Sequence, residues 1–199
     1  MKNHVQFVTV AAVTFALTAV LGLLPYVFFI PLLFTCVTRG WRMTVAESLF
    51  FGVLSLVYSY VSPASFVAAA FIENPWIPIV PRFLAGLGCH GTYVLLRRCV
   101  KGESKAATVV PVIAACAVGS LLNTALVVPC LVWRGGSLFG SYELTAALLV
   151  GQTLISGAIE LAVSVTVAPS LAITVGRALR LPDYIRKQKP TDAPSEKEA

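Results

Sequence analysis

Six long runs of apolar residues, almost free of charged side chains, constrain this chain more than any other feature. A helix needs about 20 apolar residues to cross the hydrocarbon core of a bilayer. Only 12% of the 199 residues are charged, about half of the roughly 25% found in soluble domains. Unbroken runs favour helices over a β-barrel, which needs short alternating segments. We therefore predict an all-α integral membrane bundle of six transmembrane helices, over residues 5–24, 27–37, 45–61, 76–96, 107–132 and 144–175.

Three segments depart from this simple pattern. Residues 27–37 are short for a span, so we expect either help from Tyr26 and Thr38 or a buried position inside the bundle. Residues 64–72 are apolar but too short to span, which predicts a loop or an interfacial turn. Residues 182–199 are polar, charged and proline-bearing, which predicts a disordered cytoplasmic tail after a membrane domain of residues 1–181.

The basic residues are distributed very unevenly around these segments. If all six segments cross the membrane, all but two of the 15 lysines and arginines fall on one side; the exceptions are Arg82, inside a segment, and Arg134, on the other side. Cytoplasmic loops of membrane proteins carry such an excess of positive charge. This asymmetry predicts a multi-pass membrane protein with both termini in the cytoplasm. Because the basic residues form no patch between aromatic side chains, we expect no nucleic-acid partner.

Arg82 is the first candidate for a functional site. It lies near the start of the fourth segment, after an acidic entry that is rich in prolines, and it falls on one helical stripe with Ala85, Cys89 and Tyr93. An arginine inside a membrane costs about 2.5–3.5 kcal/mol at a helix centre, so it usually faces a cavity or a partner. Two interpretations are open. Arg82 holds an anionic or carbonyl-bearing ligand in an outward-facing pocket, or it pairs structurally with Glu73, Glu143 or helix-end carbonyls.

Two further polar residues lie inside predicted spans. Asn123 in the fifth segment must find hydrogen-bond partners, either on another helix or on a ligand. Glu160 in the sixth segment is identified as the only acid well inside a span, on a polar face with Thr153, Ser156 and Ser164. An intramembrane acid is a functional candidate by default, although a structural bond to Asn123 or Arg82 is the alternative.

Other patterns point to packing rather than chemistry. Gly86-x-Gly88-x-x-Gly91 matches a dinucleotide-binding pattern but lies within a predicted span, where close helix packing is the expected role. His90 is expected to pack or form a hydrogen bond, and the five cysteines are expected to be small buried residues rather than a disulfide framework. The chain has no ATP-binding P-loop and no nucleophile–base pair, so we expect no enzyme and no cofactor in this chain.

Several short motifs nevertheless resemble one family. The pairs Asn74–Pro75 and Pro81–Arg82 entering a glycine-rich helix, the run Gly-Ser-Leu-Leu-Asn-Thr at 119–124, and Glu160 before Val-Ala-Pro at 167–169 are similar to substrate-binding S components of energy-coupling factor (ECF) vitamin transporters. The resemblance covers about residues 5–180. It implies six helices around an outward-facing pocket for a vitamin-like micronutrient, with Arg82, Asn123, Glu160, Asn74 and Trp76 as substrate contacts. The entry motif looks most like members that handle pantothenate, whose carboxylate would suit Arg82.

The resemblance also implies a place in a prokaryotic cell membrane and partner proteins. An S component works with a transmembrane coupling protein and two ATP-binding subunits, which would use the ATP that this chain cannot hydrolyse. Such proteins dock through an Ala-x-x-x-Ala motif on the first helix, which Ala12 and Ala16 match. The spacing alone allows close helix approach anywhere. A second hypothesis is a stand-alone small transporter or channel that uses Arg82 and Glu160 as an ion-coupled relay.

Overall fold

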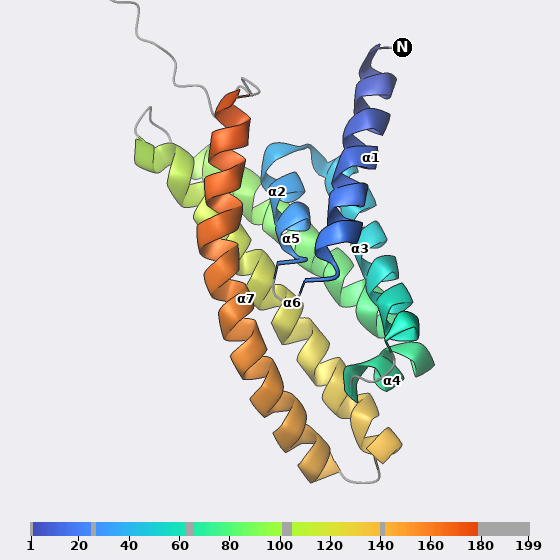
Figure 1. The fold of residues 1–199 in the computed structure, drawn as a ribbon. Coiled ribbons are helices and arrows are strands. Elements are labelled where there is room, and N and C mark those ends of the chain that lie inside the picture. Colours follow the sequence, from blue (N-terminus) through green and yellow to red (C-terminus); the bar gives the residue numbers. More distant parts are fainter. Residues whose placement is uncertain (1, 25–26, 63–65, 101–104, 140–141, 179–199) are drawn as a thin grey trace, which may run out of the picture.

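The computed structural model describes residues 2–24, 27–62, 66–100, 105–139 and 142–178, all of them in or next to helices. The predicted tail and Tyr26 lie outside these described residues. The described part of the chain is all-α (Figure 1), with helices α1 (Lys2–Leu21), α2 (Ile30–Thr38), α3 (Trp41–Val61), α4 (Phe66–Glu73), α5 (Trp76–Cys99), α6 (Lys105–Phe139) and α7 (Tyr142–Ala178).

The predicted segments correspond to helices, with two differences. The segment 64–72 is not a loop or turn in its described part: residues 66–73 form the short helix α4, because an apolar run can close two helical turns even when it is too short to span. Helix α3 begins at Trp41, after the extended Gly40, and not at residue 45. This earlier start places Glu47 in the second turn of the helix.

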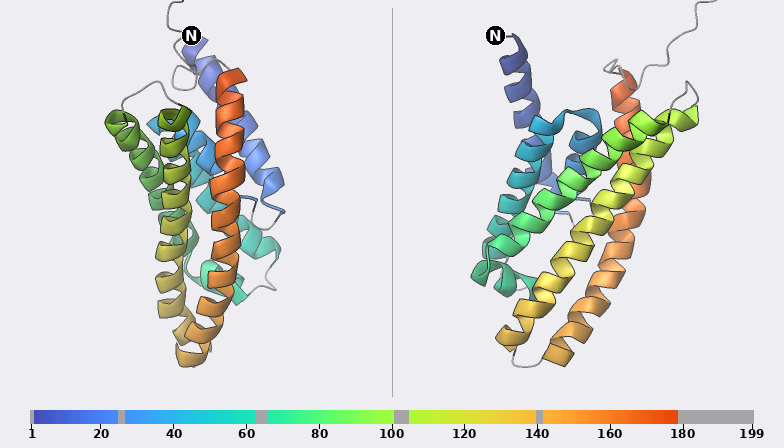
Figure 2. Two further views of the ribbon diagram at one scale, coloured as in Figure 1. Left: turned by 90° about the vertical axis from the view of Figure 1, so that its left-hand side faces the viewer. Right: turned by 180° about the vertical axis from the view of Figure 1, so that it is seen from behind.

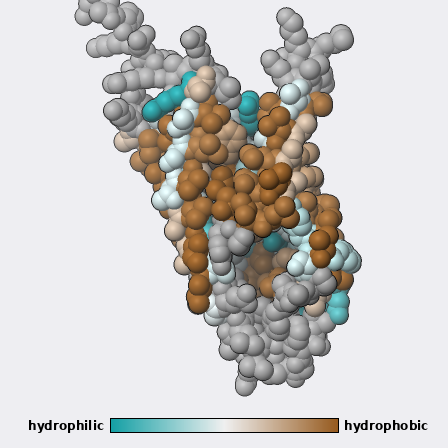
Figure 3. All heavy atoms as spheres, in the orientation of Figure 1, coloured by the Kyte–Doolittle hydropathy of each residue, from teal (hydrophilic) through white to brown (hydrophobic). Residues whose placement is uncertain are grey.

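Four helices in the described part of the chain are long and apolar enough to cross a membrane: residues Trp41–Val61, Trp76–Cys99, Ala106–Arg134 and Ile155–Ala178. The apolar part of α1, Phe7–Leu21, is shorter. Large apolar side chains such as Val8, Leu95 and Ile155 are exposed on these helices, and hydrophobic residues cover the middle of the face seen in Figure 3. This is the surface expected of a multi-pass membrane protein. The count of six spans stays a prediction.

The helices alternate in direction along the molecule. The N-terminal end of α1, the turn between α2 and α3, the facing ends of α5 and α6, and the end of α7 lie at one end (Figures 1 and 2). Helix α4 and the facing ends of α6 and α7 lie at the other end. The first group of helix ends carries Arg39, Arg42, Arg97, Arg98 and Arg177. The grouping agrees with the charge asymmetry, while the orientation in a membrane stays a prediction.

The short helix α2 occupies the centre of the bundle. It contacts α1, α3, α5, α6 and α7, and seven of its residues are buried, among them Leu32, Leu33 and Thr35. A helix that is apolar on all sides is buried either in protein or in lipid, and the nine residues of α2 are too few to cross a bilayer. Of the two expectations for this segment, the buried position is therefore confirmed.

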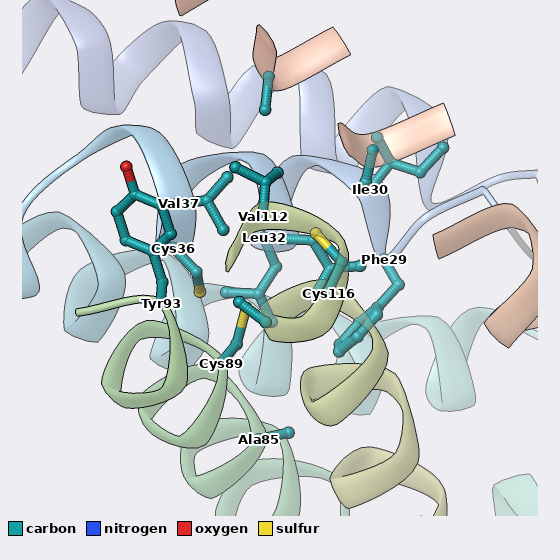
Figure 4. Packing of buried hydrophobic residues seen from close by; sticks show 14 of the residues in the cluster. Phe29, Ile30, Leu32, Cys36, Val37, Ala85, Cys89, Tyr93, Val112 and Cys116 are labelled. Atoms are coloured by element: carbon teal, nitrogen blue, oxygen red, sulfur yellow. The ribbon is translucent and has the colours of Figure 1, made fainter. Parts of the chain in front are cut away.

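Three cysteines meet in the core beside α2. Cys36, Cys89 and Cys116 are fully buried, and their side chains project into one cluster from α2, α5 and α6 (Figure 4). All are free thiols. Next to them, Nδ1 of His90 forms a hydrogen bond with the carbonyl oxygen of Cys36 at 2.7 Å. These three cysteines and the hydrogen-bonded histidine agree with their predicted structural roles. The expectation of burial is wrong for Cys99, which is exposed at the end of α5, and Cys130 is only half-buried. The described residues contain no cluster of His, Cys, Asp and Glu able to hold a metal ion.

Two of the three glycines in the fingerprint-like pattern allow close packing. A Cβ atom at Gly86 would lie 2.0 Å from Oγ of Ser48 on α3, and one at Gly88 would lie 2.3 Å from Leu122 on α6. Gly91 is exposed and a Cβ atom there would meet nothing within 4 Å. The expectation of close packing is thus wrong for Gly91, because this residue faces away from the neighbouring helices.

Candidate functional site

A pocket of about 530 Å³ opens among the end of α1, the segment before α2, and helices α3, α4 and α5. Among the described residues, Arg82 is the one charged residue of its wall, and four aromatic side chains line it as well: Phe28, Phe51, Tyr58 and Phe71. Ser55, Ser59 and Ser62 add hydroxyl groups along α3. The surface below the end of α1 is hollowed on the face shown in Figure 3. A volume of this size accommodates a small organic molecule.

Arg82 forms the polar end of this pocket. Its guanidinium lies 5.5 Å from the ring centre of Phe51 on α3 and 5.2 Å from that of Phe71 on α4, so two aromatic rings hold the cation in place. Nη1 donates a hydrogen bond to the carbonyl oxygen of Pro78, 3.1 Å away, whereas Nε is buried without a partner. Only 7% of the residue is exposed. Arg82 therefore keeps unused donor capacity beside a cavity.

The local sequence explains this position. Pro75 occupies the N-cap of α5 and Pro78 lies in its first turn, where a missing N–H group costs little. Pro81 lies in the helix interior. Burial on α5 includes Arg82, Ala85, Cys89 and Tyr93, so the predicted stripe is confirmed as the inward face of the helix.

A second polar group lies between α6 and α7. Nδ2 of Asn123 donates to Oε1 of Glu160 at 3.3 Å, and both side chains are buried. Glu160 is close enough to Arg82 for their charges to attract each other, which offsets part of the cost of burying each charge. Oδ1 of Asn123 and Oγ of Ser120 are buried and have no hydrogen-bond partner among the described residues.

Of the predicted substrate contacts, the structure brings Arg82, Asn123 and Glu160 into one electrostatic group, but only Arg82 belongs to the described lining of the pocket. Asn74 lies at the turn between α4 and α5, where its amide donates to the carbonyl oxygen of Ala70 at 3.5 Å. Trp76 packs edge-on against Trp133, with ring centres 6.5 Å apart. Neither residue lines the pocket.

The interpretation that Arg82 and Glu160 form structural hydrogen bonds is confirmed in part for each residue. Arg82 bonds a helix carbonyl, as one alternative expected, and Glu160 bonds Asn123. The side chains of Glu143 and Thr153 lie outside those that the structure describes. Because Nε of Arg82 has no hydrogen-bond partner among the described residues, these bonds do not use all of its donors.

The sequence analysis identified Glu160 as the only acid well inside a span, and the structure shows that this is wrong. Glu47 on α3 is fully buried and accepts a hydrogen bond from Oγ1 of Thr18 on α1. Sequence reasoning missed it because the predicted segment began at residue 45, which placed Glu47 at a boundary. The aromatic residues of the pocket were missed as well, since aromatic side chains are common in every apolar segment.

Ala12 and Ala16, the predicted docking residues, lie on the exposed side of α1. Helix α1 contacts only α2 and α3 among the described helices.

Comparison with known proteins adds no relative to these observations: no protein-family model, no curated protein and no solved structure matches the chain.

Proposed function

We propose that this chain is a membrane subunit that binds a small carboxylate, of the vitamin or micronutrient class, in the pocket next to Arg82. The observation that carries the proposal is a buried arginine that lines a cavity of about 530 Å³ and whose Nε has no hydrogen-bond partner among the described residues. Arginine presents several N–H donors in a fixed fork that matches a carboxylate. Pantothenate is the first ligand to test, because the motif around Arg82 resembles that of S components handling this vitamin.

The decisive test is ligand binding to the purified chain in nanodiscs. We expect pantothenate to bind the wild-type protein. R82Q should raise the dissociation constant about 10- to 100-fold, because a hydrogen bond to a charged group contributes about 1.5–3 kcal/mol. R134Q is the matched control: Arg134 is exposed and outside the pocket lining, so its removal should leave binding unchanged. Equal binding by wild type and R82Q would contradict the proposal.

We further propose that the chain acts with an ECF module, consisting of a transmembrane coupling protein and two ATP-binding subunits. The support is the resemblance together with the exposed small residues Ala12 and Ala16 on α1. We expect A12L to abolish co-purification of the partner subunits from native membranes while ligand binding persists, because a larger side chain prevents close helix approach. Loss of ligand binding in a folded A12L protein would argue against a docking role.

The stand-alone transporter remains the second candidate, favoured by the attraction between the buried charges of Arg82 and Glu160. It requires uptake into liposomes that contain this chain alone. Uptake that disappears in E160Q would establish this alternative, whereas uptake that needs the ATP-binding subunits would support the first proposal.

A further inference from the structure

The wall of the pocket formed by α3 carries a second polar feature, which the proposed function does not use. Ser55 and Ser59 lie one helical turn apart and both line the pocket. Oγ of Ser55 donates to the carbonyl oxygen of Phe51 at 2.9 Å, and Oγ of Ser59 donates to the carbonyl oxygen of Ser55 at 3.0 Å. The single hydrogen of each hydroxyl group is therefore already engaged within the helix.

A hydroxyl oxygen that donates its hydrogen still has lone pairs with which it accepts. The neighbouring Tyr58 follows the same pattern, since its hydroxyl donates to the carbonyl oxygen of Ala19. These three side chains thus offer hydrogen-bond acceptors to the cavity, whereas Arg82 offers only donors. The pocket has two chemically opposite polar regions.

The two regions are separated along α3. Phe51, which stacks on the guanidinium of Arg82, precedes Ser55 by one turn and Ser59 by two. A helix rises 1.5 Å per residue, so these serines lie about 6 Å and about 12 Å further along the helix axis. Phe28 and Leu54 supply apolar surface in the same pocket. The geometry suits an elongated ligand with a polar group at each end.

We propose that Ser55 and Ser59 select a carboxylate whose far end bears hydroxyl or N–H donors, and reject carboxylates with a plain hydrocarbon chain. The inference rests on the proposed function, because it assumes that the carboxylate lies at Arg82. In this arrangement the ligand donates to the serine oxygens, which in turn keep their bonds to the helix carbonyls. A hydrocarbon chain would leave the acceptors desolvated and unpaired, which lowers affinity.

The test compares binding of two pairs of probes to the full chain in nanodiscs. Pantothenate and biotin combine a carboxylate with hydroxyl or N–H donors, whereas octanoate and lipoate carry the carboxylate without them. We expect S55A and S59A each to weaken binding of the donor-bearing probes about threefold to tenfold, as expected for one hydrogen bond. Binding of octanoate and lipoate should change less than about twofold.

The matched control is S170A, because Ser170 makes the same type of bond to the carbonyl oxygen of Thr166, at 2.6 Å, on the exposed side of α7. Equal weakening of both probe classes by S55A and S59A would assign the serines a purely structural role and overturn the inference. So would unchanged binding of every probe in these variants. Binding of no probe to wild type, or binding that R82Q does not affect, would instead overturn the proposed function itself.

Discussion

Glu47 lies between α1 and α3 with no exposed surface, and its carboxyl accepts a hydrogen bond from Thr18. Its second oxygen, Oε2, has no partner. We expect E47A to lower the free energy of unfolding by about 1–3 kcal/mol, because it removes the acceptor and leaves a cavity. E47Q should cost less than about 1 kcal/mol, since glutamine keeps the size and an oxygen acceptor for Thr18. Thermal unfolding of the purified protein measures both.

Glu73 provides the control for this prediction, because it is an exposed glutamate at the end of α4. E73A should change the stability by less than about 0.5 kcal/mol. If E47A were as mild as E73A, the contact between Thr18 and Glu47 would not hold α1 against α3.

The crossing of helices α3 and α5 depends on Gly52. A Cβ atom at this position would lie 2.8 Å from the Cα atom of Ile79, and a backbone atom cannot move aside cheaply. We expect G52A to separate the helices, lower the unfolding temperature by several degrees, and weaken ligand binding by shifting Phe51 relative to Arg82. G91A is the control on α5: its site is open, so alanine should be neutral or stabilise the helix by about 1 kcal/mol. Similar effects of the two variants would contradict a tight crossing.

At the scale of elements, sequence patterns were informative wherever length and period decide the structure. The inward stripe of α5 and the burial of α2 follow from the spacing and the shortness of their apolar runs. The start of α3 and the helix α4 were not predictable in this way. Helix α4 depends on contacts with other elements, because a helix of eight residues is marginal by itself. Helix α3 begins directly after the extended Gly40, in a stretch that is not part of the apolar run.

The residues of the candidate site could be predicted from the sequence, but their arrangement in the whole molecule could not. Arg82, Asn123 and Glu160 stand out in the sequence because polar residues in apolar runs are rare. Their arrangement is a tertiary property: α5, α6 and α7 bring Glu160 near Arg82, while the pocket lies on the side of α3 and α4. No spacing within one segment shows which side of Arg82 is hollow.

The arrangement of helix ends leads to a prediction for the whole molecule in a membrane. Cys99 is exposed at the last residue of α5, at the end of the molecule that holds most of the described basic residues. Ser62 is exposed directly after α3, at the opposite end near α4 (Figure 1). If the basic end faces the cytoplasm, a membrane-impermeant maleimide should not label Cys99 in intact cells but should label it after permeabilisation.

The opposite result is expected for a cysteine placed at the other end. S62C in a C99S background should react with the same reagent in intact cells, because the end of α3 would face outward together with the mouth of the pocket. C99S alone is the control: Cys36, Cys89 and Cys116 are buried, and any reaction of the half-buried Cys130 shows as labelling of C99S itself. Labelling of Cys99 but not of S62C in intact cells would show the inverse orientation, with the pocket open to the cytoplasm. Uptake from outside could then not begin with binding in this pocket. Labelling of both in intact cells would mean that α3 and α5 do not connect opposite faces of the membrane.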